Sequence, residues 1–152
     1  MLLIGYGNPG RGDDGLGPAF SEAISAKRLA GLDVDTDYQL VAEHSLAIAD
    51  HDVIIFADAQ MNSAEVFTFR EIQPGAPEVL GSHSLVPETV LALCETLYGA
   101  KPQAYVLGIS GYDYGDVKEG LSPKAAGNLA QAEAFFLNWF GEQSFGKAAS
   151  NA

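Results

Sequence analysis

The segment DVIIFADA, residues 52–59, decides the fold class of this chain. Four consecutive apolar residues, Val53 to Phe56, run without polar alternation, and three of them are β-branched. Such a run is typical of a strand buried on both faces, as in a parallel sheet that is covered by helices on either side. Asp58 follows this run directly, at the end of the strand where ligands bind in open α/β sheets.

Strand and helix patterns alternate on both sides of this segment. The run LLI at residues 2–4 precedes the glycine-rich segment GYGNPGRGDDGLG at residues 5–17, which predicts a strand, a loop and then a helix. The other expected elements are a helix from Leu16 to near Gly31, strands at residues 34–41, 64–72 and 104–109, and helices at residues 45–51, from about residue 86 to 97, and from Ser122 and Pro123 onward.

This order of elements predicts a single three-layer α/β domain, residues 1–152, with a five-stranded, mainly parallel sheet and helices on both faces. Strict alternation at residues 64–72 predicts an antiparallel edge strand with one face in water. Ser84 is the expected N-cap of the third long helix, and Cys94 lies on the apolar face of that helix. We expect residues 141–152 to be a frayed tail.

The composition limits the partners of this protein. Its 152 residues include 8 Lys and Arg against 20 Asp and Glu, a formal charge of -12. A surface of this charge repels phosphate backbones, so we expect no nucleic acid partner. The single cysteine, Cys94, has no disulfide partner, and neither a signal peptide nor a membrane-spanning apolar segment is apparent. We therefore expect a cytoplasmic protein that does not interact with membranes.

Candidate functional residues follow the strands of the predicted sheet. Asp13 and Asp14 end the first loop, Asp58 ends the central strand, and His83 precedes the third long helix. Because the carboxyl ends of parallel strands meet at one edge, two of these carboxylates and the imidazole could offer oxygen and nitrogen ligands to a divalent metal. Zinc, nickel and iron all suit such a set, and the spacing does not rank them.

Each of these residues also has a structural explanation. An Asp in a glycine-rich turn is most often a helix N-cap, and a loop histidine is commonly just solvated. Asp58 is the strongest candidate, because an acid directly after a buried strand is costly unless something pairs with it. His44 follows the second strand and is a weaker candidate for a substrate contact, whereas His51 lies at the start of a strand and has no predicted role.

Other catalytic motifs are weak or missing. The segment GYGNPG, residues 5–10, matches the G-x-G-x-x-G pattern of dinucleotide-binding proteins, but no acid ends the second strand as that pattern requires. Asp13 and Asp14 would also place negative charge where a pyrophosphate binds. The sequence contains no G-x-S-x-G, H-E-x-x-H or D-T-G motif, and Cys94 is expected in the core rather than as a nucleophile.

Taken together, five segments resemble the nickel-iron hydrogenase maturation endopeptidases: GYGNPGRGDDGLG at 5–17, VIIFADA at 53–59, SHSLVPETVLAL at 82–93, YGAKPQAYVLGISG at 98–111 and GLSP at 120–123. The resemblance covers roughly residues 2–140, in family order. It implies a five-stranded α/β sandwich and a cytoplasmic peptidase that removes a C-terminal extension from the hydrogenase large-subunit precursor after nickel insertion. It also implies that Asp14, Asp58 and His83 contact that nickel, with Asp14 standing where some members carry Glu.

The resemblance implies that the substrate itself delivers the nickel, so no tightly bound cofactor is expected on the protease. Either the metal acts as a Lewis acid, or a carboxylate acts as general base on water. Two alternatives compete with this reading. One is a nickel-binding module that docks on a partner without cutting it. The other is a peptidyl-tRNA hydrolase, whose N-terminus is similar, but RGDDG replaces the cluster that carries its catalytic histidine.

Overall fold

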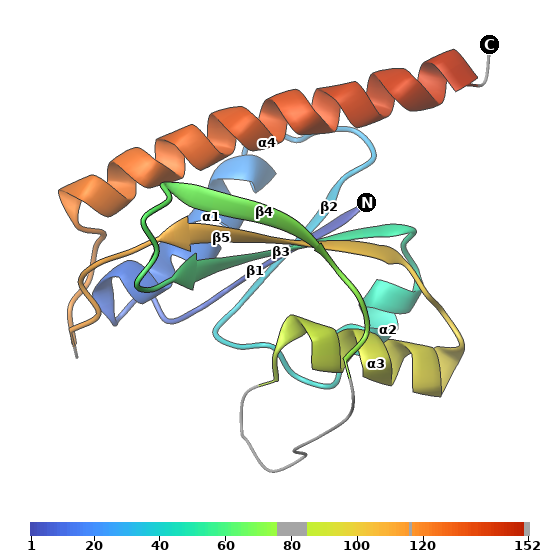
Figure 1. Ribbon diagram of the computed structural model, residues 1–152, viewed down its shortest axis with the longest axis horizontal. Coiled ribbons are helices and arrows are strands. Elements are labelled where there is room, and N and C mark those ends of the chain that lie inside the picture. Colours follow the sequence, from blue (N-terminus) through green and yellow to red (C-terminus); the bar gives the residue numbers. More distant parts are fainter. Residues whose placement is uncertain (76–84, 116, 151–152) are drawn as a thin grey trace.

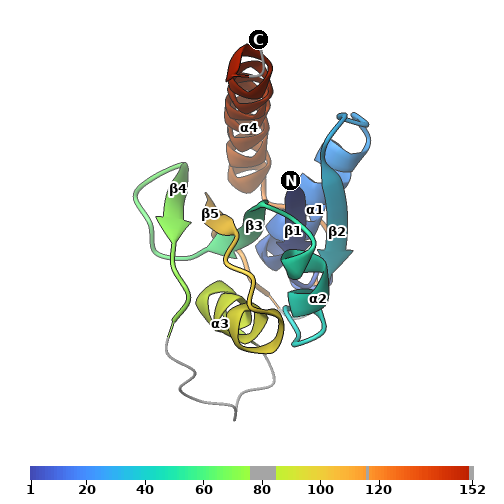
Figure 2. The same ribbon diagram turned by 90° about the vertical axis from the view of Figure 1, so that its right-hand side faces the viewer.

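The computed structural model describes residues 1–75, 85–115 and 117–150, the last seven of these as backbone only. Five strands form one sheet in the order β2-β1-β3-β5-β4 (Figure 2). They are β1 (Leu2–Tyr6), β2 (Asp33–Asp37), β3 (Val53–Gln60), β4 (Phe67–Ile72) and β5 (Gln103–Ser110). All neighbours pair in parallel except β4, which lies antiparallel to β5 at one edge. The predicted five-stranded, mainly parallel sheet with one antiparallel edge strand is confirmed.

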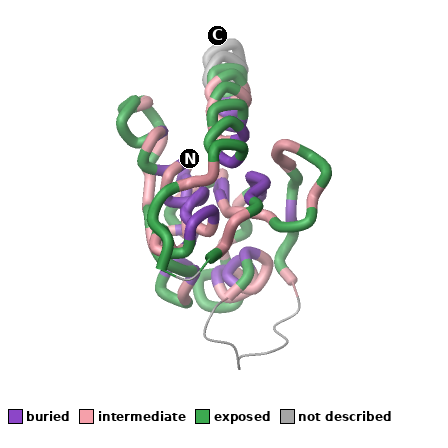
Figure 3. The backbone as a smooth tube through the Cα atoms, turned by 90° about the vertical axis from the view of Figure 1, so that its left-hand side faces the viewer, coloured by how far each residue is buried: buried purple, intermediate pink, exposed green. Residues whose placement is uncertain are grey.

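Helices cover both faces of the sheet (Figure 1). One face carries α1 (Leu16–Ser25) and α4 (Pro123–Ser150), and the other carries α2 (His44–Ala49) and α3 (Pro87–Tyr98). Successive residues of a strand pack into the two cores on opposite faces of the sheet, because side chains alternate across a sheet. Ile55 packs in the core that includes Phe20 and Phe136, whereas Phe56 packs in the core that includes Val90 and Cys94. Buried residues accordingly concentrate in the middle layer of the molecule (Figure 3).

Several predicted elements extend too far: β4 begins at Phe67 rather than at residue 64, and α2 ends at Ala49 rather than at residue 51. The second strand ends at Asp37, not at residue 41, because its neighbour β1 ends at Tyr6, the residue that pairs with Asp37. The first helix ends at Ser25, not near Gly31, because the chain turns through Arg28, whose φ of 49° is left-handed.

The boundaries of the two long C-terminal helices also differ from expectation. Val86 occupies the N-cap position of α3 without a side-chain hydrogen bond, and the predicted cap, Ser84, lies outside the described residues. The backbone of α4 remains helical to Ser150, through a segment expected to fray from residue 141. Glu142, Gln143, Lys147, Ala148 and Ala149 in this segment favour the helical conformation, whereas Gly141 and Gly146 do not.

Cys94 behaves as a core residue. It is fully buried in α3, and this burial raises the pKa of its thiol. None of the helices that the structure describes has the length and apolar character needed to cross a membrane.

Candidate functional site

A cavity of about 670 Å³ opens on the α3 side of the sheet, toward the carboxyl ends of β1 and β3. The loop after β1, the end of β3, the surface of β4 and β5, and the segment that leads into α3 line its walls. Its polar lining residues include Tyr6, Asn8, Arg11, Asp14, Asp58, Gln60, Thr68, Arg70 and Glu88. The cavity therefore lies where an open α/β sheet places its ligands.

Asp58 lies near the end of β3 and is partly buried in the cavity wall. Burial raises the pKa of this carboxyl to about 6, since a charged group loses its hydration there. A hydrogen bond from the Tyr6 hydroxyl and one from the Ala59 N–H group act in the opposite direction, while the negative charge of Asp14 raises the pKa further. The pKa of the Tyr6 hydroxyl is itself raised, first by burial and then by the charge of Asp58.

Asp14 reaches the same cavity from the short 3₁₀ helix η1 (Gly12–Gly15). Its Oδ2 atom accepts a hydrogen bond from the Asn8 N–H group at 2.8 Å. Gly7 allows this close packing: its φ is +145°, and a Cβ atom there would lie only 2.0 Å from the Asp14 carbonyl oxygen. The glycine-rich loop thus brings Asp14 into electrostatic interaction with Asp58.

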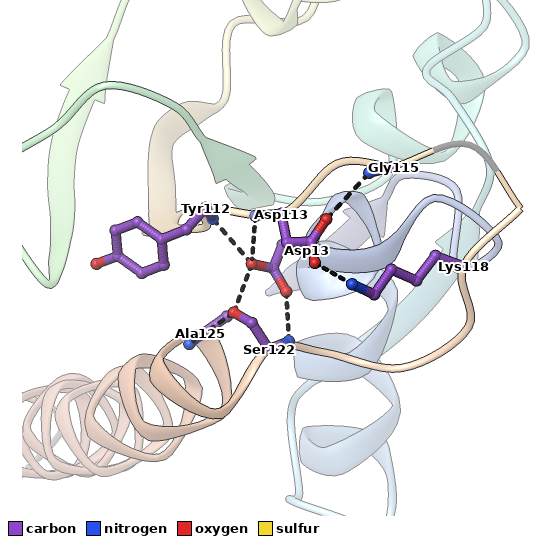
Figure 4. A network of polar contacts seen from close by, with 7 residues as sticks. All are labelled: Asp13, Tyr112, Asp113, Gly115, Lys118, Ser122 and Ala125. Carbon is purple, nitrogen blue, oxygen red and sulfur yellow. Dashed lines mark hydrogen bonds and ion pairs between the residues drawn. The ribbon is translucent and has the colours of Figure 1, made fainter.

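Asp13, the neighbouring acid, has a different role (Figure 4). Its side chain is 0% exposed and accepts hydrogen bonds from the N–H groups of Tyr112, Asp113 and Ser122 and from the Ser122 hydroxyl, at 2.7 to 3.0 Å. Burial alone would raise the pKa of Asp13, but these four bonds lower it below its ordinary value. Asp13 therefore ties η1 to residues 112–113 and to the start of α4, and is not exposed to a ligand.

His83 lies outside the described residues, so its position relative to Asp14 and Asp58 remains a prediction. The segment that follows it reaches the cavity, because Leu85 and Val86 form part of the lining. Within the part of the chain that the structure describes, no three His, Cys, Asp or Glu side chains form a metal-binding group. A site with three such ligands at this cavity would need a side chain from outside the described residues, and His83 is the one that the sequence predicts.

The other two histidines are engaged elsewhere. His44 is only 5% exposed; its Nδ1 atom accepts the Val41 N–H group at 2.9 Å, and its Nε2 atom lies 3.7 and 3.5 Å from carboxylate oxygens of Asp35 and Asp37. It is not among the described residues that line the cavity. The Nε2 atom of His51 lies 2.7 Å from a carboxylate oxygen of Asp33, and His51 too is absent from the described cavity lining.

We compared the sequence and the structure with those of known proteins. No protein-family model and no curated protein matches the sequence. The hydrogenase maturating endopeptidase HybD from E. coli superposes with a TM-score of 0.72 at 19% identity, over 93% of this chain and 92% of its own. The hydrogenase maturation protease HycI from Thermococcus kodakarensis superposes with a TM-score of 0.66 at 21% identity, over 88% of each chain. The chain has the fold of the hydrogenase maturation endopeptidases. The fold implied by the sequence resemblance is confirmed.

Most of the cavity lining was not predicted from the sequence, including Tyr6, Gln60 and Thr68. Gln60 could have been found, because it lies two residues beyond Asp58 on the same strand and so faces the same side. Tyr114 lies next to the site as well. Burial, followed by the charges of the three aspartates Asp13, Asp14 and Asp58, raises the pKa of its hydroxyl to about 12.

Proposed function

We propose that this protein is an endopeptidase that removes the C-terminal extension of a nickel-iron hydrogenase large-subunit precursor once nickel has been inserted. The observation that carries the proposal is the pair of carboxylates, Asp14 and Asp58, which line one cavity at the carboxyl edge of this fold. With the imidazole of His83 they would supply oxygen and nitrogen ligands, a set that suits nickel. The nickel arrives with the substrate, and the free protease holds no tightly bound metal.

The negative charges of Asp14 and Asp58 would let the protease distinguish a nickel-loaded precursor from a metal-free one. Asp14 and Asp58 are both partly buried, and the charge of Asp14 raises the pKa of Asp58. A metal-free precursor would leave two neighbouring negative charges poorly solvated, whereas a nickel ion between them would compensate both. The loaded precursor should therefore bind more tightly than the metal-free one.

The same pair can assist hydrolysis. A carboxyl with a pKa of about 6 is mostly ionised at neutral pH and is more basic than an ordinary Asp, so it can accept a proton from water. A nickel ion bound to the same carboxylate would lower this pKa, so both chemical roles, Asp58 as general base and nickel as Lewis acid, enter the proposal. A volume of about 670 Å³ falls within the range of ligand sites, and a short extended stretch of peptide fits it.

The test is to incubate the protein with a nickel-loaded large-subunit precursor from the organism that encodes it, and to weigh the product by mass spectrometry. We expect loss of the C-terminal extension with the loaded precursor and no loss with the metal-free one. Asp58→Asn should abolish cleavage, whereas Asp50→Asn, which changes an exposed aspartate outside the cavity, should not. Binding without cleavage would favour the non-cleaving docking module, and efficient cleavage of a nickel-free precursor would refute nickel recognition.

A further inference from the structure

Gln60 occupies an unusual place beside Asp58. Asp58 on β3 pairs with Gly108 on β5, which pairs in turn with Thr68 on β4, so these residues form one row across three strands. Gly108 has no side chain, and the Gln60 side chain fills its place: a Cβ atom on Gly108 would lie 2.4 Å from Gln60 Oε1. Since neighbouring strands are about 4.8 Å apart, the carboxamide of Gln60 lies about one strand spacing from Asp58.

Hydrogen bonds fix which way this carboxamide points. The Thr68 hydroxyl donates to Gln60 Oε1 at 2.8 Å, and Gln60 Nε2 donates to Ser110 Oγ at 3.1 Å. Ser110 uses its own hydrogen to donate to the Glu65 carbonyl oxygen, so towards Gln60 it is an acceptor. The nitrogen of Gln60 therefore faces Ser110, and its second N–H group has no acceptor among the described residues.

The backbone of Gln60 is held equally firmly. Its carbonyl oxygen accepts the Gly111 N–H group at 3.0 Å and the Tyr114 hydroxyl at 3.1 Å. Gln60, Thr68, Gly108 and Asp58 all line the cavity. The cavity wall thus contains a carboxamide of fixed orientation: its Oε1 atom lies over Gly108, about one strand spacing from Asp58, and its Nε2 atom keeps one N–H group without an acceptor among the described residues.

We propose that the second N–H group of Gln60 donates to the carbonyl oxygen of the peptide bond that is cleaved. This inference rests on the proposed endopeptidase function. When water adds to the carbonyl carbon, a carboxylate of the Asp14–Asp58 pair takes a water proton, and the electron pair of the C=O bond moves to oxygen. The Gln60 donor stabilises this oxygen until its electron pair re-forms the C=O bond. The C–N bond then breaks, and the leaving nitrogen takes the proton that the carboxyl had accepted from water.

The decisive variant is Gln60→Met, which keeps the length of the side chain and removes the donor. We expect kcat for the nickel-loaded precursor to fall about 100-fold, the loss typical of one such donor, with KM changed by less than about threefold. Thr68→Val removes the hydroxyl that helps orient the carboxamide but leaves the Gln60 donor and its bond to Ser110 in place, so kcat should fall less than in Gln60→Met, by about tenfold. Gln103→Met is the matched control: it makes the same substitution at an exposed residue of β5 outside the cavity, and kcat should stay within about threefold of wild type.

Gly108→Ala tests the same geometry without altering Gln60. The new Cβ would displace the flexible end of the Gln60 side chain, so kcat should fall at least about tenfold while the melting temperature changes little. A kcat of Gln60→Met within about threefold of wild type would overturn the inference and leave Gln60 a link between strands. Wild-type protein that fails to cleave would instead refute the proposed function, and this inference with it.

Discussion

Asp13 and Asp14 are adjacent and chemically identical, yet the structure predicts opposite consequences when each is changed to Asn. Asp13→Asn keeps the shape of the side chain but replaces one acceptor oxygen with an NH₂ group. If the amide oxygen takes the Oδ2 position, the NH₂ group faces the Ser122 N–H group, which loses its acceptor in a fully buried place.

The magnitude follows from these bonds. A buried donor without an acceptor costs roughly 1–3 kcal/mol, and three other hydrogen bonds lose the contribution of the charge, about 0.5–1 kcal/mol each. Asp13→Asn should therefore lower the free energy of unfolding by about 3–5 kcal/mol, a large share of the 5–15 kcal/mol typical of a domain. Asp14→Asn retains an oxygen for its single bond from Asn8, and should cost less than about 1 kcal/mol.

The assay is urea unfolding of both variants and the wild type at pH 7, followed by precursor cleavage. Asp14→Asn should remain near wild-type stability and lose cleavage, because it removes a charge from the cavity. Folding lowers the pKa of Asp13 below 3.8. The ionised side chain therefore contributes its full stabilisation of the fold above pH 3.8, and this contribution is lost as the pH falls through the pKa of the folded state. The stability difference between wild type and Asp13→Asn should narrow in that acidic range. Equal destabilisation by the two variants would refute the division of roles.

Three further predictions concern the residues of the cavity and the absence of a resident metal. Asp58→Asn should abolish cleavage and raise the melting temperature at pH 7. The pKa of this carboxyl is raised from 3.8 to about 6 on folding, so its ionised form destabilises the fold. This destabilisation is absent below pH 3.8 and complete above pH 6. Thermal melts at pH 3.5 and pH 7 check this, and equal effects at both would contradict it. Tyr6→Phe removes a hydrogen bond that lowers the pKa of Asp58, so the acidic limb of the pH–rate profile should shift to higher pH; an unchanged limb would count against Asp58 as the base. A chelator should leave the melting temperature of the free protein unchanged, which calorimetry can measure, and a clear drop would indicate a resident metal.

The sequence predicts the sheet well because its signals are local. The continuous apolar run at residues 53–56 indicates a buried parallel strand, and β3 is one. The alternation of apolar and polar residues at 64–72 indicates an exposed edge strand, and β4 lies at the edge of the sheet. Strand ends depend on partners instead: β2 stops where β1 stops, and nothing within residues 34–41 encodes that limit. For the site, Asp58 follows from strand position alone. The sheet face of Gln60 follows from its spacing to Asp58, but the orientation of its carboxamide depends on the empty place over Gly108, which is created by pairing with a strand about 50 residues away.

The assignment of Asp14 rather than Asp13 to the cavity has a geometric cause. Both residues belong to η1, and in a 3₁₀ helix consecutive side chains point about 120° apart, so only one of two adjacent acids can face the cavity. The other points inward, where three N–H groups and a hydroxyl from residues 112–122 converge on it. That inner acid anchors the turn on which Asp14 is mounted to the start of α4. The position of Asp14 beside Asp58 is therefore set before any substrate binds, and two carboxylates held close together are what the proposed recognition of nickel needs.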